Sequence, residues 1–323
     1  MASWTRGSGS ADRVGSRRAG PGAPVAAPAE LRVPRATPTA AAPVAERGPV
    51  RRARGRRNTA LITGAIVIGA WTLVALLAPV VAPHSPLDLD VMNRLEPPSL
   101  SHPFGTDEAG RDNFSRVLYG ARITLPVAFV VILMASIVGV VVGAVAGYAG
   151  GRTDDVLMRI VDVVLAFPPI LLAMAITAAL GAGLRHAMLA ILLVSWPEFS
   201  RLMRAQVLWV RENDYVIAAR ALGSPAARIM LTHILPNAFP PVVVKATLDI
   251  GNAIILTAAL SFIGLGAIPP DPEWGAMIAA GQGKFEYWWA ATFPGLAILS
   301  VVLGFNFLGD GLQDRLNPRL ARD

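Results

Sequence analysis

Six long apolar runs, separated by shorter polar stretches, form the pattern of the chain from residue 58 onward. The first lies within residues 58–83, "NTALITGAIVIGAWTLVALLAPVVAP". It is long enough to cross the roughly 30 Å hydrocarbon core of a bilayer as a helix. The other runs cover roughly residues 123–148, 160–180, 186–203, 241–265 and 288–308. This pattern predicts an all-α, polytopic membrane protein with six transmembrane helices.

Arginines are distributed unevenly around these spans. The cluster "RRARGRR" at residues 51–57 directly precedes the first span, which is longer than the apolar core of a secretory signal. If this cluster marks the cytoplasmic side, the other segments on that side are also richer in arginine than those outside. We therefore expect a multi-pass membrane protein with its N- and C-termini in the cytoplasm. Lys245 and Lys284 are the only lysines, and Ala, Gly and Val are abundant; this bias indicates a GC-rich bacterial genome, and hence a bacterial cell membrane.

The composition agrees with a membrane protein and excludes several kinds of site. Of 323 residues, 54% are hydrophobic and 16% are charged, whereas a soluble domain carries about 25% charged residues. The absence of cysteine excludes disulfides and cysteine-ligated metals. The net charge is +7, but the basic residues border apolar spans. We therefore expect contact with membrane lipid and no binding of nucleic acid.

Residues 1–57 precede the first span and consist mainly of Ala, Pro, Arg, Gly and Ser. Such a segment cannot bury enough apolar surface to offset the entropy lost on ordering. It is predicted to be a disordered cytoplasmic tail, either a regulatory arm or a solvated extension without a role.

One polar, alanine-rich stretch, "RENDYVIAARALGSPAARIMLTHILPN" (211–237), lies on the predicted cytoplasmic side. Asn213 or the residue after it would begin a short helix, and Gly223 would end that helix. Ser224 would cap a second helix, with Pro225 in its first turn. The narrow, alanine-rich helix end could insert into a groove of another protein, or it could lie as an amphipathic loop on the lipid surface. The pattern alone leaves both alternatives open.

Several charged residues fall within or beside the predicted spans. Lys245 and Asp249 are four residues apart and would pair on one helix face. Because intramembrane charges usually face a cavity or a partner, these two residues, or Asp162, could instead contact the substrate. Between the first and second spans, on the predicted extracytoplasmic side, Asp112 and Arg116 are also four residues apart and could pair in the same way.

Small residues and prolines mark two further features of the spans. Gly139, Gly143 and Gly147 form a small-residue stripe that permits close packing of helices. Pro168 and Pro169 interrupt the third span, where they would kink the helix, either as a moving joint or as a static bend.

No catalytic or metal-binding motif is evident in the sequence. The four histidines, His84, His102, His186 and His233, are scattered and lack the spacing of metal ligands. The segment "GQGKF" (281–285) lacks the upstream glycine and the following Ser or Thr of a phosphate-binding loop. The chain is therefore predicted not to be an enzyme.

Four segments resemble one known family. The pattern in the polar stretch resembles the EAA signature of binding-protein-dependent ABC transporter permeases, here Ala218, Ala219, Gly223, Leu235 and Pro236. Three more resemble the C-type permease subunit of dipeptide and oligopeptide importers: "HPFGTDEAGRDNFSRVLYGARITL" (102–125), "PPDPEWGAMI" (269–278) and "NFLGDGLQDRLNPRL" (306–320). The resemblance covers residues 59–320. The signature usually begins with Glu, but this chain has Ile217 there, so no ion pair can come from that position.

The resemblance implies a type I ABC importer permease fold and a division of the chain. The tail (1–57) would be followed by an N-terminal transmembrane helix with an extracytoplasmic segment (58–120), an ABC transmembrane type-1 domain (121–310) and a cytoplasmic C-terminal tail (311–323). In that family the EAA loop, around residues 214–236 here, inserts into a groove of the ATPase. The residues thereby assigned to ATPase coupling are Ala218, Ala219, Arg220, Ala221, Leu222, Gly223, Ser224, Pro225, Arg228, Leu235 and Pro236.

The function implied is that of a permease subunit forming half of the translocation pathway of an ATP-driven peptide importer. Its partners would be a B-type permease subunit, cytoplasmic ABC ATPase subunits, an extracytoplasmic substrate-binding protein and the peptide substrate. ATP and Mg²⁺ would be used by the ATPase, and this chain would bind no cofactor or metal. Related permeases carry nickel chelates or glutathione, so the solute stays open. The rival interpretations are a secondary transporter, which predicts repeats of broken helices, and a membrane anchor for a signalling complex.

Overall fold

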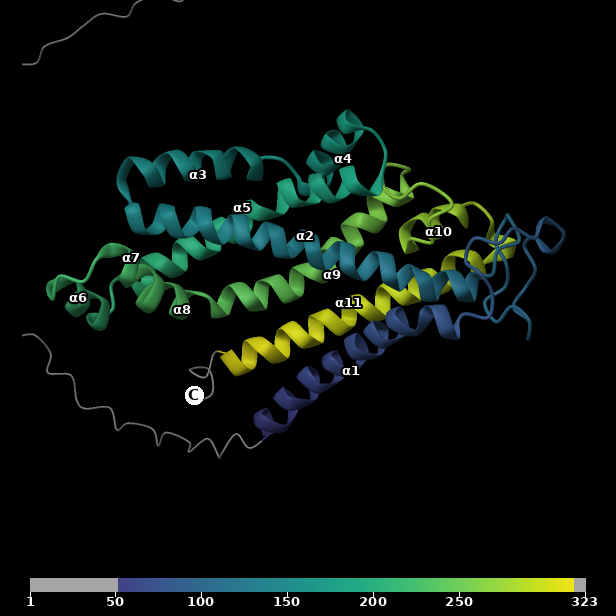
Figure 1. The fold of residues 1–323 in the computed structure, drawn as a ribbon, viewed down its shortest axis with the longest axis horizontal. Helices are drawn as coiled ribbons and strands as arrows, with labels where there is room; N and C mark the ends of the chain where they lie inside the picture. The colour runs from purple at the N-terminus through teal and green to yellow at the C-terminus, as the bar shows by residue number, and fades with distance from the viewer. Residues whose placement is uncertain (1–51, 317–323) are drawn as a thin grey trace, which may run out of the picture. The chain divides into compact units, whose positions relative to one another are not determined.

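The computed structural model describes residues 52–316, with side chains from residue 59 onward. Within that range every regular element is a helix, and Thr106 and Asp112 form an isolated β-bridge. Figure 1 shows the long helices running side by side along one direction. The predicted all-α class is confirmed. The disordered tail predicted for residues 1–57 lies outside the described residues as far as residue 51, and residues 52–57 belong to the first helix.

Four of the described helices contain a stretch long and apolar enough to cross a membrane. They are α1 (Arg52–Val81), α2 (Asn113–Ala149), α9 (Pro240–Phe262) and α11 (Trp289–Leu316). A fifth candidate is the pair α3 (Gly151–Leu165) and α4 (Pro169–Leu180), which bends by 86°. The bend falls at Pro168 and Pro169, where ring sterics and missing N–H groups interrupt the helix. The predicted break in the third span is confirmed.

The fourth predicted span lies in α5 (Leu184–Val210), a helix of 27 residues. At 1.5 Å per residue it is about 40 Å long, which exceeds the hydrocarbon core. It is less apolar than the other candidates because it carries Glu198, Arg201 and Arg204. Each of these side chains is paired with a residue on a neighbouring helix, so these three charges are directed toward other parts of the protein.

The glycine stripe of α2 packs directly against α5, as predicted. A Cβ at Gly143 would lie 2.9 Å from Met203 Cβ, and one at Gly147 would lie 3.0 Å from Val207 Cβ. Such separations are too short for carbon atoms, which have their optimal contact at about 3.5–4.0 Å. Only glycine therefore allows the two helices to approach this closely.

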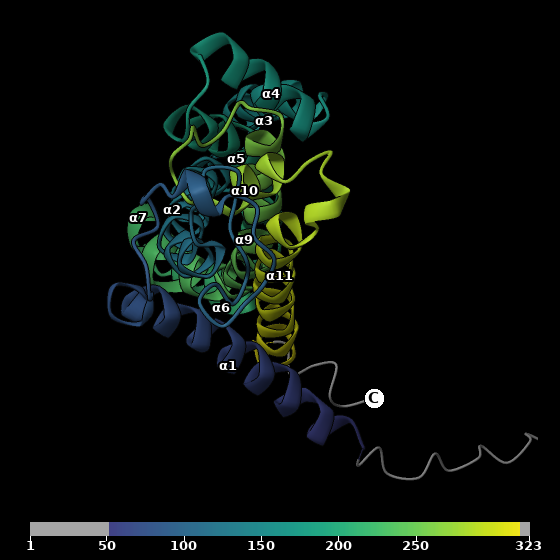
Figure 2. The same cartoon turned by 90° about the vertical axis from the view of Figure 1, so that its right-hand side faces the viewer.

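The first and last long helices are also in close contact (Figure 1), and Figure 2 shows α1 crossing α11 at an angle. A Cβ at Gly304 would lie 2.8 Å from Val67 Cγ1. A hydrogen bond from Trp71 Nε1 to Ser300 Oγ, 2.9 Å long, joins the same two helices. Helix α11 continues to Leu316, beyond the domain end expected at residue 310.

The shorter elements gather at the two ends of the long helices (Figure 1). One end holds α6 (Asp214–Ala221), α7 (Ala226–Ile229), the π-helical turn η2 (Met230–Ile234) and α8 (Leu235–Ala238). The opposite end holds η1 (Val91–Asn93), α10 (Trp274–Ala280) and η3 (Phe285–Tyr287). Trp274 is fully buried there, and its Nε1 donates to the Val117 carbonyl at 3.0 Å.

Candidate functional site

The predicted break in the polar stretch is a tight corner between α6 and α7. The Gly223 N–H donates to the Arg220 carbonyl, and the Ser224 N–H donates to the Ala219 carbonyl. These two bonds form a Schellman motif, which places the residue after the helix in a left-handed conformation. Gly223 has φ of +79°, a value that glycine adopts without penalty. The predicted helix end at Gly223 is confirmed.

The start of the second helix differs from the prediction by one residue. Pro225, and not Ser224, is the N-cap of α7. Beyond α7 the Leu235 N–H donates to the Met230 carbonyl, five residues back, before α8 begins. Pro236 follows in the first turn of α8, where its missing N–H leaves the α-helical ladder incomplete. The π-helical turn η2 thus lies directly before this interruption, as a single turn, the form in which π-helix mostly occurs.

The corner buries apolar side chains on its inner face and exposes one at its tip. Val216, Ile229 and Ile234 are buried, whereas Leu222 is 87% exposed. A Cβ at Gly223 would have no heavy atom within 4 Å, so the tip is surrounded by open space. Among the predicted coupling residues, Ala218, Arg220, Ala221, Leu222, Gly223, Pro225, Arg228 and Pro236 are exposed, and Ala219, Ser224 and Leu235 are partly buried. This arrangement suits contact with a second surface.

The charged residues of α9 form a small cluster with α5. Lys245 Nζ lies 2.9 Å from Asp249 Oδ2, so the predicted pair forms. Lys245 also donates to Glu198 Oε2 at 2.6 Å, a partner that helical spacing could not reveal because it comes from another helix. The cluster thus holds one cation and two anions, and the Glu198 side chain is 50% exposed. An exposed charge at this position must face water or a partner rather than lipid.

Two further ion pairs join α3 to α5. Asp162, which could have contacted substrate on sequence grounds, pairs with Arg201 at 2.6 Å. Arg204 donates from Nε and Nη2 to the two oxygens of Asp154, each at 2.5 Å. This is a bidentate pair, the strongest common geometry for arginine and a carboxylate. Asp154 and Arg204 lie on separate helices, so no sequence spacing predicts their pairing.

At the opposite end, the segment between α1 and α2 (residues 82–112) is organised around two aspartates. Asp107 accepts hydrogen bonds from the Ala109 N–H and from Arg111 Nε, at 2.8 and 2.7 Å. Asp112 is the N-cap of α2 and accepts from the Ser115 N–H at 2.8 Å. The predicted Asp112–Arg116 pair is therefore wrong: Arg116 Nε lies 3.6 Å from Asp107 instead, because the cap orients Asp112 toward the backbone of its own helix.

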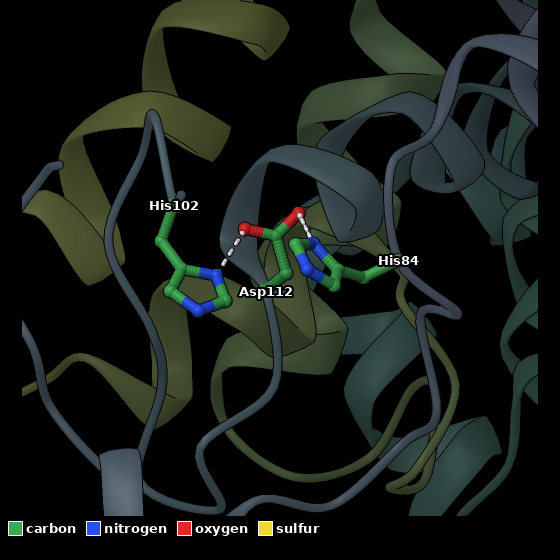
Figure 3. A group of neighbouring side chains, drawn as sticks. All are labelled: His84, His102 and Asp112. Atoms are coloured by element: carbon green, nitrogen blue, oxygen red, sulfur yellow. Dashed lines mark hydrogen bonds and ion pairs between the residues drawn. The ribbon is translucent and has the colours of Figure 1, made fainter. Parts of the chain in front are cut away.

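Two histidines that are far apart in the sequence, His84 and His102, meet at this cap (Figure 3). His102 Nδ1 lies 3.0 Å from Asp112 Oδ1, and His84 Nδ1 lies 3.8 Å from Asp112 Oδ2. The two imidazole rings have centroids 4.9 Å apart. No spacing rule links residues 84, 102 and 112, so their proximity arises only from the folding of the segment. It corrects the conclusion that the chain has no constellation with metal-ligand chemistry.

Comparison with known proteins gives consistent similarities. Residues 139–322 match the model of the binding-protein-dependent transport system inner membrane component, and residues 51–98 match the N-terminal transmembrane domain of oligopeptide transport permease C. The dipeptide transport system permease protein of Alkalihalophilus pseudofirmus is 46% identical over 82% of this chain and 88% of that protein. A probable D,D-dipeptide transport system permease protein of Escherichia coli is 46% identical over 80% of this chain and 87% of that protein.

Solved structures share the fold. A chain from the inward-facing MetNI methionine ABC transporter matches 62% of this chain and 96% of its own length, with a TM-score of 0.52 and 20% identity. A second crystal form of that transporter gives a TM-score of 0.53. At this identity the likeness concerns the arrangement of helices and nothing finer.

Proposed function

The chain belongs to the family of binding-protein-dependent transport system inner membrane components, and we propose that it is the C-type permease subunit of an ATP-driven importer of dipeptides or oligopeptides. Relatives that are 46% identical over most of the chain are named for dipeptide and D,D-dipeptide transport. Those names support peptides over the nickel chelates and glutathione carried by other permeases. Family membership also favours an ATP-driven subunit over a secondary transporter or a signalling anchor.

The proposed importer needs subunits that this chain does not supply. A B-type permease would provide the other half of the pathway, and an extracytoplasmic binding protein would deliver the peptide. Cytoplasmic ABC ATPase subunits would bind ATP and Mg²⁺ and hydrolyse the nucleotide. Both termini, and the corner between α6 and α7, would then lie in the cytoplasm. The placement of the corner and of the α1–α2 segment at opposite ends of the long helices supports this topology (Figure 1).

The exposed tip of the corner is the observation that best supports docking on an ATPase subunit. Leu222 is 87% exposed, on a turn whose backbone is closed by the Schellman hydrogen bonds of Gly223 and Ser224. A groove on an ATPase subunit could bury this side chain, at about 25 cal/mol for each Å² of apolar surface removed from water. A rigid turn would lose little conformational freedom on docking.

The corner is well placed to transmit movement into the membrane. In the chain it lies between α5 and α9, and buried Val216 and Ile229 anchor it against the rest of the protein. Closure of the ATPase pair on ATP would displace the docked corner, and with it the ends of both helices. The bundle would respond only if the corner is bound with different free energy in the inward- and outward-facing states. The energy for transport would come from ATP and not from this chain.

A charge at the tip tests this proposal. In the importer co-expressed with its partner subunits, Leu222→Asp should abolish co-purification of the ATPase, since docking would bury a carboxylate in an apolar groove. The side chain is exposed, so the permease itself should keep its thermal stability. Leu100→Asp is the matched control because Leu100 is fully exposed in the α1–α2 segment and should retain the ATPase. Equal ATPase retention by the Leu222→Asp variant and the unmodified chain would refute the assignment of the corner.

A further inference from the structure

The cluster of His84, His102 and Asp112 has no part in the coupling proposed above. Its three side chains come from separate positions along the α1–α2 segment and converge on the first turn of α2 (Figure 3). One ligand-type atom from each residue lies within 4.8 Å of those from the other two. Potential ligands drawn from distant positions in a loop are brought together only by a defined backbone path.

Backbone hydrogen bonds hold each of the three residues in place. The His84 N–H donates to Ser115 Oγ at 3.2 Å, which ties the end of α1 to the first turn of α2. The His102 N–H donates to Ser99 Oγ at 3.1 Å, and its carbonyl accepts from the Ser99 N–H at 2.9 Å. Asp112 is fixed by its cap bond to the Ser115 N–H. These bonds fix the backbone positions of His84 and His102 and the orientation of the Asp112 carboxylate.

The spacing of the three groups suits a single ion. Bonds of 2.0–2.2 Å to nitrogen and oxygen place the ligands of a tetrahedral zinc ion about 3.3 Å from one another. His102 Nδ1 lies 3.0 Å from Asp112 Oδ1 and His84 Nδ1 lies 3.8 Å from Asp112 Oδ2, so the two contacts, made to different carboxylate oxygens, fall on either side of that value. The contact with His102 is a hydrogen bond, which a bound ion would replace. The longer contact exceeds a hydrogen bond, so His84 approaches the carboxylate without bonding to it.

We propose that His84, His102 and Asp112 form a binding site for Zn²⁺ or a similar divalent transition-metal ion. Two imidazoles and a carboxylate are the ligands that such ions favour, whereas Ca²⁺ and Mg²⁺ require oxygen. Asp112 is 1% exposed and His102 15%, while His84 is 44% exposed. The ion therefore enters from the His84 side, and a water or an external donor fills the fourth position. Once bound, it fastens the α1–α2 segment to the start of α2.

Direct metal analysis tests the site independently of transport. The full chain, purified with its partner subunits and without an oligohistidine tag, is stripped with EDTA and dialysed against Zn²⁺ or Mg²⁺. Unmodified protein should retain one more zinc per permease chain than His84→Ala and His102→Ala, and no more magnesium. Loss of an outer contact alone weakens metal affinity by about 10–100-fold, so loss of a ligand should weaken it at least tenfold. His233→Ala should bind like the unmodified chain, because His233 lies in the π-helical turn η2, which belongs to the opposite end of the long helices.

Thermal unfolding supplies a second readout. Zinc should raise the Tm of the unmodified chain and of His233→Ala, because a ligand that binds the native state stabilises it, but not that of His84→Ala. The His84→Ala variant should fold, since only the backbone of His84 makes the bond to Ser115. Equal zinc content in His84→Ala and unmodified protein, or zinc-induced stabilisation that persists in that variant, would overturn the proposal.

Discussion

Lys245 on α9 and Glu198 on α5 form an ion pair, with the Nζ and Oε2 atoms 2.6 Å apart. The pair joins the two helices that flank the corner in the chain. Lys245 bonds to Asp249 as well, so it is the shared cation of two carboxylates. The ionic link between α5 and α9 therefore depends on a single ammonium group, in addition to the apolar packing of the two helices.

Replacing that ammonium group should lower the stability of the folded protein measurably. Lys245→Met leaves both carboxylates without their cation, which costs 3–5 kcal/mol for a fully buried pair. Because the Glu198 side chain is half exposed, we expect roughly 1–2 kcal/mol, seen as a lower Tm in detergent. Lys284→Met is the control: Lys284 pairs with exposed Glu108, and its loss should cost about 0–1 kcal/mol. Equal Tm values for the two variants would contradict this role of Lys245.

Alanine substitutions at two glycines, one in the stripe of α2 and one on α1, should change the stability of the protein in opposite directions. Gly143→Ala puts a Cβ 2.9 Å from Met203 Cβ, which should separate α2 from α5 and cost about 1–3 kcal/mol by overpacking. Gly69→Ala on α1 places its Cβ in open space, where alanine should stabilise the helix by about 0.5–1 kcal/mol. Thermal unfolding of both variants under one protocol makes the comparison. A Gly143→Ala protein as stable as Gly69→Ala would show that the close approach of the helices is not required.

At the corner, backbone conformation and side-chain size can be separated. Gly223 has φ of +79° and open space around it, so Ala costs about 1–2 kcal/mol through strain and not through a clash. Asn tolerates this conformation better than Ala. We expect ATP-driven uptake of labelled dipeptide in vesicles to fall for Gly223→Ala and to recover partly for Gly223→Asn. If Asn is worse than Ala, the size of the side chain, and not φ, controls docking.

A substitution in the bidentate pair between α3 and α5 can separate the contribution of hydrogen-bond geometry to stability from that of charge. Arg204→Lys keeps the positive charge but cannot reproduce the two parallel bonds to Asp154. The Tm should fall by an amount matching about 1–2 kcal/mol. This is less than the roughly 1.5–3 kcal/mol of a hydrogen bond to a charged group, because the Arg204 side chain is 34% exposed. A matched Arg201→Lys change, in a pair whose side chains are both 55% exposed, should have little effect. A larger loss from Arg201→Lys would reverse the ranking of the two pairs.

Sequence patterns predicted the features of this protein that depend on neighbouring residues. The apolar runs predicted the helices, the Gly-Ser-Pro run predicted the corner, and i,i+4 spacing predicted the Lys245–Asp249 pair. The predicted N-cap of α7 was wrong by one residue, because Ser224 completes the Schellman motif of the preceding helix. Local rules favoured only an N-cap role for Ser224, and the hydrogen bonds of the folded corner show that its N–H instead completes the end of the preceding helix.

The interactions that the sequence could not predict join residues that no local spacing rule links. Glu198 meets Lys245 only when α5 and α9 pack together. The prolines at 168 and 169 indicated a break, but the 86° angle depends on tertiary packing. His84 and His102 reach Asp112 through backbone bonds of an irregular segment, for which neither helical nor strand periodicity gives a signal.

The contact between α1 and α11 has a consequence for how the protein is made. Trp71 and Ser300, whose side chains are hydrogen-bonded, are separated by 229 positions. A ribosome adding 5–20 residues per second needs on the order of 10–50 s to cover that distance. Throughout this interval α11 has not been synthesised, so the face of α1 that packs against it remains uncovered. In a chain that ends before the last helix, this face of α1 stays uncovered. A membrane protease or chaperone could therefore recognise incomplete chains by it.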